Sequence, residues 1–458
     1  MLFRLLSAII IFLVFTFPCK SQDRFFSKDE IKADLIFLKA QLERWHPNLY
    51  TYSTPEQIKG WFQEQIKNLP DSINDLQAFA LVASISPLIM DGHSYVYPGG
   101  KYLNYFFGGA PLFPLDVLWI NDSLKVLRNY PFSGKIEPGA IITRINSLDV
   151  NQIRNFIVNR LSRDGKNSAY AEYLFSVFFQ AWIAAFYGFE EEYIIDIMHL
   201  SGEQEQVRLK GLSRNQIQTI RKDFLAGQER GLRLHLNRNN RSALMTIQSF
   251  SNDIIKHDFK QNYRKEMKHY FKQIQEDSIN LLFIDLRGNQ GGELKNGIEL
   301  LKYFMHEKFI AVESFTRIKL KNTGERETIE FTNKWNSAFA ALGRYHFSGR
   351  VVLLTDGGSF SCASIVAHVF RKYARGKIWG EMTGGSQNIL SGSPNKKVKL
   401  PNTGIQFSIP LTGYVLSEKI NKESEGIAPD FIWSPALPER LMNDSERLNL
   451  LNNLHSQE

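Results

Sequence analysis

The chain has 458 residues, of which 43% are hydrophobic and 22% are charged. This composition is typical of globular proteins and excludes a largely disordered chain, while the length predicts two or three domains. The formal net charge of +8 comes from 55 basic and 47 acidic residues scattered along the sequence. Because no basic stripe is interleaved with aromatic residues, the sequence argues against a nucleic-acid-binding protein.

Residues 1–21 have the pattern of a secretory signal peptide. A basic start at Arg4 leads into an apolar run at 5–17, which is shorter than the about 20 residues that span a membrane. The small residues Cys19 and Ser21 precede a cleavage point. We therefore expect export to the periplasm, the cell surface or the medium, with no membrane span left after signal removal. The alternatives are an uncleaved N-terminal anchor and a lipid anchor at Cys19.

Residues 22–105 are expected to form a helical N-terminal domain. Ser27 and Glu30 have the spacing of a capping box. Apolar residues then recur at helical spacing as far as the Trp-His-Pro sequence at 45–47, which ends the first helix. Two further helices lead into the turn Asp-Gly-His-Ser at 91–94, and a short strand follows it.

Residues 106–200 have a β-rich pattern. Strand-like runs at 113–119 and 124–127 flank an Asn-Asp turn, and a Pro-Gly turn, another strand and a helix follow. This order is similar to that of PDZ-like modules, which bind peptide termini by adding a strand to a sheet edge. An unrelated β-rich insertion is the alternative. Residues 201–241 show no clear pattern and are assigned to a linker.

Residues 242–440 alternate between apolar strands and helices. Apolar runs at 280–286 and 350–355 are each followed by a helical pattern. Buried strands that alternate with helices indicate an α/β core. The last residues, 441–458, are expected to be a C-terminal tail.

The strand at 350–355 runs through a sharp turn into a helix that opens at Ser361. At such a turn the serine hydroxyl is exposed beside the free N–H groups and the positive dipole end of the helix. These groups can stabilise the oxyanion that forms during acyl transfer. The alternative is that the serines here only cap the helix.

Two other turns carry polar residues that could take part in chemistry. Residues 285–293 read Asp-Leu-Arg-Gly-Asn-Gln-Gly-Gly-Glu, and the glycines allow the backbone to approach another group closely. No Gly-Lys-Ser/Thr follows, so this is not a phosphate-binding loop of the Walker type. The second turn is Asp-Gly-His-Ser at 91–94, which contains His93. Each turn alone is a weak signal and is common in structural loops.

Together these motifs occur in a characteristic order. The turn at 285–293 is followed by Ser-Phe-Ser-Cys-Ala-Ser at 359–364, Gly-Glu-Met-Thr-Gly-Gly at 380–385 and Glu-Gly-Ile-Ala-Pro-Asp at 425–430. In this order they resemble the C-terminal processing peptidase family, including its tricorn-core branch, over residues 242–435. The resemblance implies a crotonase-like α/β catalytic core, accompanied by a PDZ-like domain and a helical N-terminal domain.

The resemblance also implies roles for individual residues. Ser361 matches the family's nucleophile. The N–H group of Cys362 and that of either Gly291 or Gly292 match the family's oxyanion hole.

The expected general base departs from the processing branch of the family. That branch uses a lysine at the position that is Ser386 in this chain. The tricorn branch instead takes a histidine from upstream of its PDZ-like region, and His93 matches that location. Histidine titrates near neutral pH, which suits a general base. In tricorn-type sites a downstream glutamate orients the histidine, and Glu425 is preferred here slightly over Glu423.

The sequence therefore predicts an exported serine endopeptidase whose substrates are peptides or proteins. A PDZ-like module would recognise these substrates by their C-termini. We expect no cofactor, and no metal, because no cluster of His, Cys and carboxylate residues has ligand spacing. Since the lysine is missing, a peptide-binding pseudoprotease is the alternative. An acyl-CoA enzyme on the same core is disfavoured, because CoA substrates are intracellular. The oligomeric state is not indicated.

Overall fold

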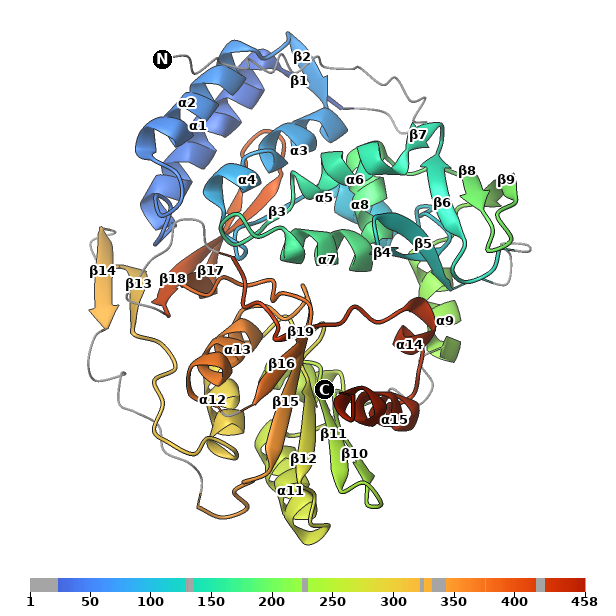
Figure 1. Cartoon of the computed structure of the whole chain (residues 1–458). Coiled ribbons are helices and arrows are strands. Elements are labelled where there is room, and N and C mark those ends of the chain that lie inside the picture. The colour runs from blue at the N-terminus through green and yellow to red at the C-terminus, as the bar shows by residue number, and fades with distance from the viewer. Residues whose placement is uncertain are drawn as a thin grey trace, which may run out of the picture.

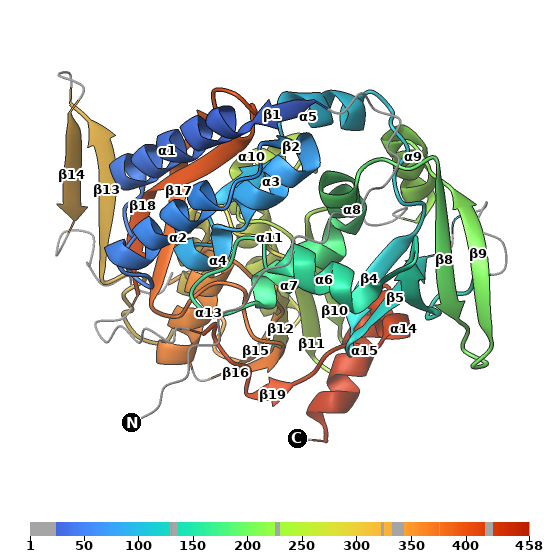
Figure 2. The same ribbon diagram turned by 90° about the horizontal axis from the view of Figure 1, so that it is seen from above.

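The computed structural model describes residues 24–128, 130, 136–224, 230–321, 325–331, 343–374, 376–416 and 425–457. The N-terminal helices lie at one end of the molecule and a layered α/β core lies at the other, with a β-rich segment beside them (Figure 1, Figure 2). No helix among these residues is long and apolar enough to cross a membrane.

Helices dominate the first part of the described chain. Its elements are β1 (Phe25–Ser27), α1 (Lys28–Trp45), α2 (Pro55–Lys67), β2 (Ser72–Asn74), α3 (Asp75–Ala83), α4 (Ser86–Ile89), β3 (Tyr95–Tyr97) and α5 (Gly100–Phe107). The predicted capping box is present, since the Ser27 hydroxyl accepts the N–H of Glu30 and the Glu30 carboxylate accepts the N–H of Ser27. The helix ends at Trp45, before the proline, as predicted.

The next part forms an antiparallel sheet with helices packed on it. Its elements are β4 (Asp116–Ile120), β5 (Ser123–Arg128), β6 (Ile141–Ile145), β7 (Leu148–Asp149), α6 (Val150–Val158), α7 (Ala169–Val177), α8 (Phe179–Tyr187), β8 (Glu192–Met198), β9 (Gln204–Lys210) and α9 (Arg214–Phe224). The strand order is β4-β5-β6-β8-β9, with β7 beside β6. Thus the expected linker, 201–241, contains the strands β9 and β10 (Leu232–Asn237) and the helix α9. Five of the seven residues of β9 are exposed and Leu209 is its one buried position, so the apolar alternation that predicts strands is weak here.

The α/β core is built on a second six-stranded sheet. Its elements are β10 (Leu232–Asn237), β11 (Ser242–Ile247), α10 (Asn252–His257), α11 (Tyr263–Glu276), β12 (Leu281–Asp285), α12 (Leu294–Lys302), β15 (Arg350–Thr355), α13 (Cys362–Tyr373), β16 (Lys377–Gly380) and β19 (Phe431–Ile432). The order is β10-β11-β12-β15-β16-β19, parallel except for β10. Because β12 and β15 are parallel neighbours, the turns after them meet at one edge of the sheet.

A third sheet joins the N-terminal part to the core. Its strands are β13 (Ser314–Leu320), β14 (Arg326–Phe331), β17 (Ile389–Lys399) and β18 (Gln406–Val415), in the order β14-β13-β18-β17. Strand β3 pairs antiparallel with β18 through Tyr95 and Ser408. This pairing fixes the turn at 91–94 against the core, although the two segments are far apart in the sequence.

The C-terminal residues are not an unstructured tail. They form α14 (Leu437–Arg440) and α15 (Asp444–His455). Leu448 and Leu451 of α15 are fully buried in a cluster with Phe283 and Trp379 of the core sheet. Leu454 of the same helix is partly buried against this cluster.

Candidate active site

Ser361 lies at the N-terminus of α13, immediately after the turn that follows β15. Its backbone has φ 54° and ψ −120°, a conformation that non-glycine residues rarely adopt. The Ser361 side chain makes no capping hydrogen bond with α13. The structure therefore does not support the alternative in which Ser361 only caps the helix, and its hydroxyl is available for another partner.

That partner is His93. The Nε2 atom of His93 lies 3.0 Å from the Oγ atom of Ser361. The imidazole packs against the ring of Phe360, with centroids 4.6 Å apart, and only 7% of His93 is exposed. Burial disfavours the charged imidazolium and lowers the pKa of His93 to about 4, although the negative charge of Asp91 opposes the shift. The neutral ring can therefore accept a proton across a wide pH range.

Asp91 supplies a buried negative charge beside His93. Its Oδ1 atom accepts the backbone N–H of His93 at 2.8 Å, and its Oδ2 atom lies 3.4 Å from Nε2 of His46. Burial alone would raise the pKa of Asp91, but its electrostatic and hydrogen-bonding interactions, chiefly with His46, outweigh burial and lower the pKa to about 2. Nδ1 of His46 accepts the N–H of Asn48 at 3.1 Å, which places the ring proton on Nε2, facing Asp91.

Asp164 is a second buried carboxyl group that sequence reasoning missed. It accepts the N–H groups of Gly92 at 2.6 Å and of Ser386 at 3.3 Å. Burial and the neighbouring charge of Asp91 raise the pKa of Asp164 well above its usual value. The only sequence signal is an Asp-Gly turn at 164–165, which is common in loops. Asp164 thus ties the turn that carries His93 to the segment that carries Ser386.

Asp91, His93 and Asp164 place potential metal-binding atoms within 4.8 Å of one another. This geometric cluster was not visible in the sequence, because Asp164 is remote from the other two. Both carboxylates, however, already accept backbone N–H groups. The observed contacts therefore describe a rigid polar support for His93 rather than an open ring of metal ligands.

The N–H groups predicted to form the oxyanion hole belong to the start of α13 and to the glycine turn. Gly291 and Gly292 have φ values of 98° and 139°, which favour glycine. The Gly291 N–H donates to Oδ1 of Asn289 at 2.9 Å. Within the described part of the chain, the N–H groups of Gly292 and Cys362 have no acceptor. Of the two glycines predicted as donors, Gly292 is therefore the one whose N–H group is free.

The carboxylate expected to orient His93 is not in contact with it. The Glu425 side chain is exposed, and its backbone carbonyl accepts the N–H of Gln387 at 3.1 Å. Glu423 lies outside the described residues. Nδ1 of His93 has no hydrogen-bond partner among the described residues. Ser386, at the position of the family's lysine, is fully buried, and its hydroxyl accepts the N–H of Asn388 at 3.0 Å.

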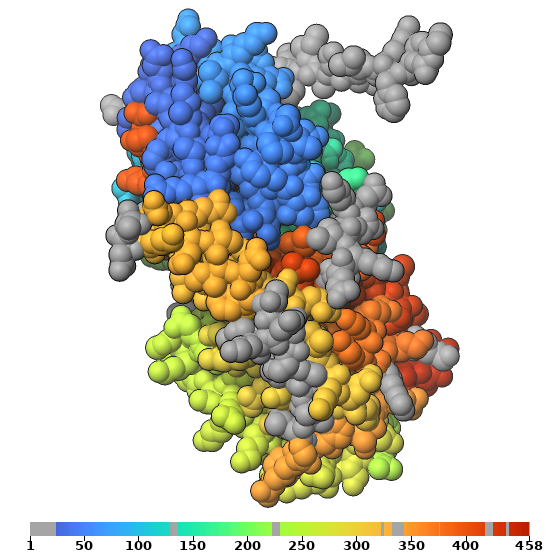
Figure 3. Space-filling model, turned by 90° about the vertical axis from the view of Figure 1, so that its left-hand side faces the viewer, coloured from blue at the N-terminus to red at the C-terminus, as the bar shows by residue number. Residues whose placement is uncertain are grey.

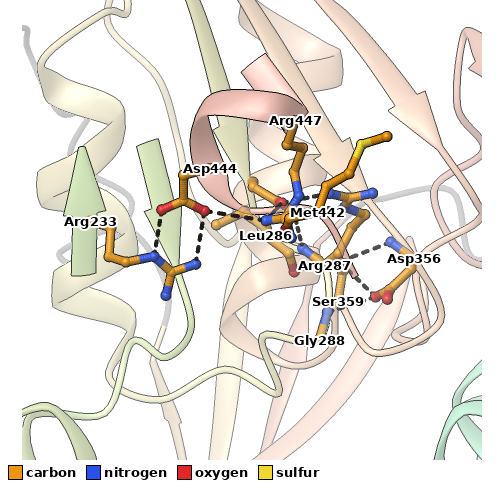
Figure 4. A network of polar contacts seen from close by, with 10 residues as sticks. Arg233, Leu286, Arg287, Gly288, Asp356, Ser359, Met442, Asp444 and Arg447 are labelled. Carbon is orange, nitrogen blue, oxygen red and sulfur yellow. Dashed lines mark hydrogen bonds and ion pairs between the residues drawn. The ribbon is translucent and has the colours of Figure 1, made fainter. Parts of the chain in front are cut away.

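A network of ion pairs fixes the turn after β12 (Figure 4). Arg287 donates to both carboxylate oxygens of Asp285, at 2.8 and 2.7 Å. Arg447 of α15 lies 3.7 Å from the same carboxylate. The Asp356 carboxylate accepts the N–H of Gly288 at 2.8 Å and thereby joins this turn to the one that precedes Ser361. These contacts hold the glycine turn in register with the serine.

Comparison with known proteins relates this arrangement to a peptidase family. Residues 241–433 match the model of peptidase family S41. Carboxyl-terminal-processing peptidase 2, chloroplastic, of Arabidopsis thaliana is 23% identical over 188 residues, which cover 41% of this chain and 32% of the relative. A carboxyl-terminal-processing protease of Synechocystis sp. is 27% identical over 133 residues, which cover 29% of this chain and 27% of the relative. The chain thus spans about a third or less of the length of these curated relatives.

A solved structure shares the fold over almost the whole chain. The structure of mature CPAF complexed with lactacystin has a TM-score of 0.67 at 16% sequence identity, and the alignment covers 94% of this chain and 98% of that one. The mixed α/β architecture is therefore shared with that solved structure. The match over residues 241–433 and the two curated relatives confirm the resemblance to the C-terminal processing peptidases and relate this part of the chain to peptidase family S41.

Proposed function

We propose that the chain is an exported serine endopeptidase with Ser361 as its nucleophile and His93 as its general base. The observation that carries the proposal is the 3.0 Å separation of His93 Nε2 and Ser361 Oγ at the start of α13. A serine hydroxyl is a weak nucleophile unless a base lies within hydrogen-bonding distance. His93 meets that requirement without the lysine that is missing at Ser386.

In the proposed reaction, Oγ of Ser361 forms a bond to the carbonyl carbon of the scissile peptide while its proton moves to Nε2 of His93. The N–H groups of Gly292 and Cys362 stabilise the negative oxygen of the tetrahedral intermediate. His93 then gives the proton to the leaving amine as the C–N bond breaks. A water molecule attacks the acyl-serine in the same way and releases the second product.

Two sources of negative charge are proposed for the protonated His93. Asp91 is buried beside the ring and holds the backbone of His93. The family resemblance offers Glu425 or Glu423 as the carboxylate that orients the ring. Asp91 is proposed to stabilise protonated His93 more strongly than either glutamate does, because a buried charge is screened less than an exposed one.

The remaining parts of the proposal concern the substrate and the architecture. The sheet from β4 to β9 is proposed to be a PDZ-like domain that presents the C-terminus of a peptide or protein substrate, and the sheet from β10 to β19 a crotonase-like catalytic core. Residues 22–105 complete the layout as a helical N-terminal domain. The signal pattern at 1–21 supports export to the periplasm, the cell surface or the medium.

Labelling with a fluorophosphonate probe tests the catalytic pair. We expect the wild-type chain to be labelled, and Ser361→Ala and His93→Ala to lose labelling. The matched control is His235→Ala, which removes a histidine from the edge strand β10 and should be labelled like the wild type. Circular dichroism of each variant separates loss of chemistry from loss of folding. A folded wild-type chain that neither reacts with the probe nor cleaves unfolded casein would instead identify a pseudoprotease.

A further inference from the structure

A groove of about 840 Å³ lies beside the candidate active site, between helices α11 and α12 and the strands β13 and β14. Figure 3 looks onto this side of the molecule, where the amber strands β13 and β14 lie below the blue N-terminal helices and above the yellow-green helices. Neither His93 nor Ser361 lines the groove, and the peptidase mechanism above leaves it unused.

The groove is lined mainly by positively charged side chains. Six basic residues line it: Arg264, Lys268, Lys295, Lys302, Arg317 and Arg344. Glu299 is the single carboxylate among the described lining residues, and it is 3.5 Å from Arg264. Lys268 and Lys295 are exposed, and no carboxylate pairs with either of them in the described part of the chain. The groove therefore presents an excess of positive charge that an anionic ligand can neutralise.

The walls of the groove are aromatic. The rings of Phe315 and Phe331 stack with centroids 4.3 Å apart, and the ring centroid of Tyr414 lies 5.8 Å from that of Phe315. Tyr303 and Tyr345 complete the lining. Aromatic walls between cations favour a ligand that carries apolar or aromatic groups as well as negative charge. A small inorganic anion would leave these walls unused.

One end of the groove reaches the catalytic turn. Leu294, which lines the groove, begins α12 two residues after Gly292. Helix α12 packs against α13, and the Cys362 thiol lies 3.6 Å from the carbonyl oxygen of Glu293. A polypeptide bound with its scissile bond at Ser361 can therefore continue along α12 into the groove.

We propose that the groove binds a segment of the substrate polypeptide, close to the scissile bond, that is rich in acidic and aromatic residues. This proposal rests on the proposed peptidase function, because it identifies the substrate class of the same site. Exposed Lys268 and Lys295 meet the carboxylates, and Phe315 and Phe331 pack against the aromatic side chains. Charge complementarity of this kind raises the association rate and selects between partners.

The test compares three fluorogenic peptides built around a bond that the wild-type chain cleaves in unfolded casein. The acidic flank contains Phe with Asp and Glu, the neutral flank contains Phe with Asn and Gln, and the basic flank contains Phe with Lys. Each flank is tested first on one side of the scissile bond and then on the other. We expect the highest kcat/KM for an acidic flank on one side of the bond, and a decline of this advantage as salt is raised.

Charge reversal assigns the preference to the groove. The double variant Lys268→Glu/Lys295→Glu should lower kcat/KM for the acidic peptide by roughly tenfold, given the modest strength of exposed ion pairs, and leave the neutral peptide within about twofold. Lys28→Glu/Lys32→Glu, an equal change of charge at two exposed lysines of α1, is the matched control. An acidic preference that persists in the double variant, or none in the wild type, would overturn the proposal.

A binding measurement separates this proposal from the catalytic one. Fluorescence anisotropy of three labelled peptides that consist of the acidic, neutral or basic flank alone, with the folded Ser361→Ala variant, needs neither hydrolysis nor a known scissile bond, and the acidic peptide should bind most tightly. If the wild type cleaves nothing but this order of binding holds, the peptidase function fails and the groove proposal stands. Tighter binding of a single-stranded DNA oligonucleotide than of the acidic peptide would overturn the choice of a peptide ligand.

Discussion

Nε2 of His93 and Oγ of Ser361 lie 3.0 Å apart although 268 residues separate them in the sequence. Two independent features produce this contact. The pairing of β3 with β18 holds His93 at the core, and the parallel strands β12 and β15 bring the glycine turn and Ser361 to the same sheet edge. The contact therefore depends on long-range packing, and it can be probed through the protonation of His93.

The first prediction concerns the pH dependence of labelling at Ser361. Because burial lowers the pKa of His93 to about 4, the ring stays neutral and able to accept a proton well below pH 6. The rate constant for fluorophosphonate labelling should therefore hold to about pH 5 and fall with a midpoint near 4. A midpoint between 6 and 7, at the ordinary value of histidine, would contradict a buried base.

The same shift affects stability. The folded-state pKa of His93 lies below the unfolded value of 6.5, so the unfolded chain binds the additional proton between these two values. This contribution to stability is present above pH 6.5 and is lost as the pH falls towards 4. In urea unfolding followed by circular dichroism, the free energy of unfolding of wild type should thus fall more steeply than that of His93→Gln over this range.

The second prediction separates the carboxylates that could stabilise protonated His93. Asp91→Asn keeps an oxygen for the N–H of His93 but removes the charge, and we expect the labelling rate to fall by roughly 10²-fold, as for a buried charge at close range. Glu425→Gln and Glu423→Gln are the matched comparisons and should change the rate by less than about threefold; the charge of Glu425 is exposed and therefore screened. A larger loss in either glutamine variant than in Asp91→Asn would reverse the assignment.

Residues around Ser361 show what the sequence could predict and what it could not. The buried strands β12 and β15 were predicted, because continuous apolar runs mark strands covered on both faces. Ser361 and His93 were both predicted, since their motifs match a known family. Asp164 was missed because its partners, Gly92 and Ser386, are 72 and 222 residues away. Such contacts arise from tertiary packing and leave no local pattern.

Strands and helices with weak apolar periodicity were missed for a related reason. In β14 intermediate and exposed residues alternate without a buried position, and β9 has a single buried position, Leu209. Edge strands of this kind are defined by backbone pairing to a neighbour, which the sequence does not encode locally. The groove described above, which uses β14 as a wall, could therefore not be predicted.

The third prediction tests the close approach of the glycine turn to the nucleophile. In Gly291→Ala the new Cβ would lie 2.7 Å from Cβ of Ser361 and 2.9 Å from the backbone nitrogen of Cys362, at a φ of 98°. We expect fluorophosphonate labelling to fall by at least about 10²-fold, as for loss of an oxyanion donor, and stability to fall by about 1–3 kcal/mol.

Gly60→Ala is the matched control for that substitution. Gly60 lies within α2, and an added Cβ there meets nothing within 4 Å. Alanine is the better helix former, so the control should gain up to about 1 kcal/mol of stability and keep its labelling rate. Normal labelling of Gly291→Ala would show that the turn does not need to approach Ser361 so closely.

The fourth prediction concerns Cys362, which follows the proposed nucleophile. Burial raises the pKa of its thiol to about 12, and 2% of the residue is exposed. Thiol reactivity requires the thiolate, so iodoacetamide should not modify the native protein in a Cys19→Ser background, where Cys362 is the one remaining cysteine. The same protein unfolded in urea should react fully. Rapid alkylation of the folded chain with loss of labelling would instead make Cys362 a candidate nucleophile.

The last prediction concerns α15, which supports the site from outside the matched family region. Leu451 is fully buried against the core sheet, and Arg447 of the same helix lies 3.7 Å from Asp285. Leu451→Ala should therefore lower the free energy of unfolding by about 2–5 kcal/mol. The control Leu200→Ala changes a leucine that is 72% exposed and should stay within about 0.5 kcal/mol of wild type. Equal stabilities of the two variants in urea unfolding would show that α15 does not pack on the sheet in solution. In that case Asp285 would retain only Arg287, and the glycine turn would lose its link to the C-terminal helix.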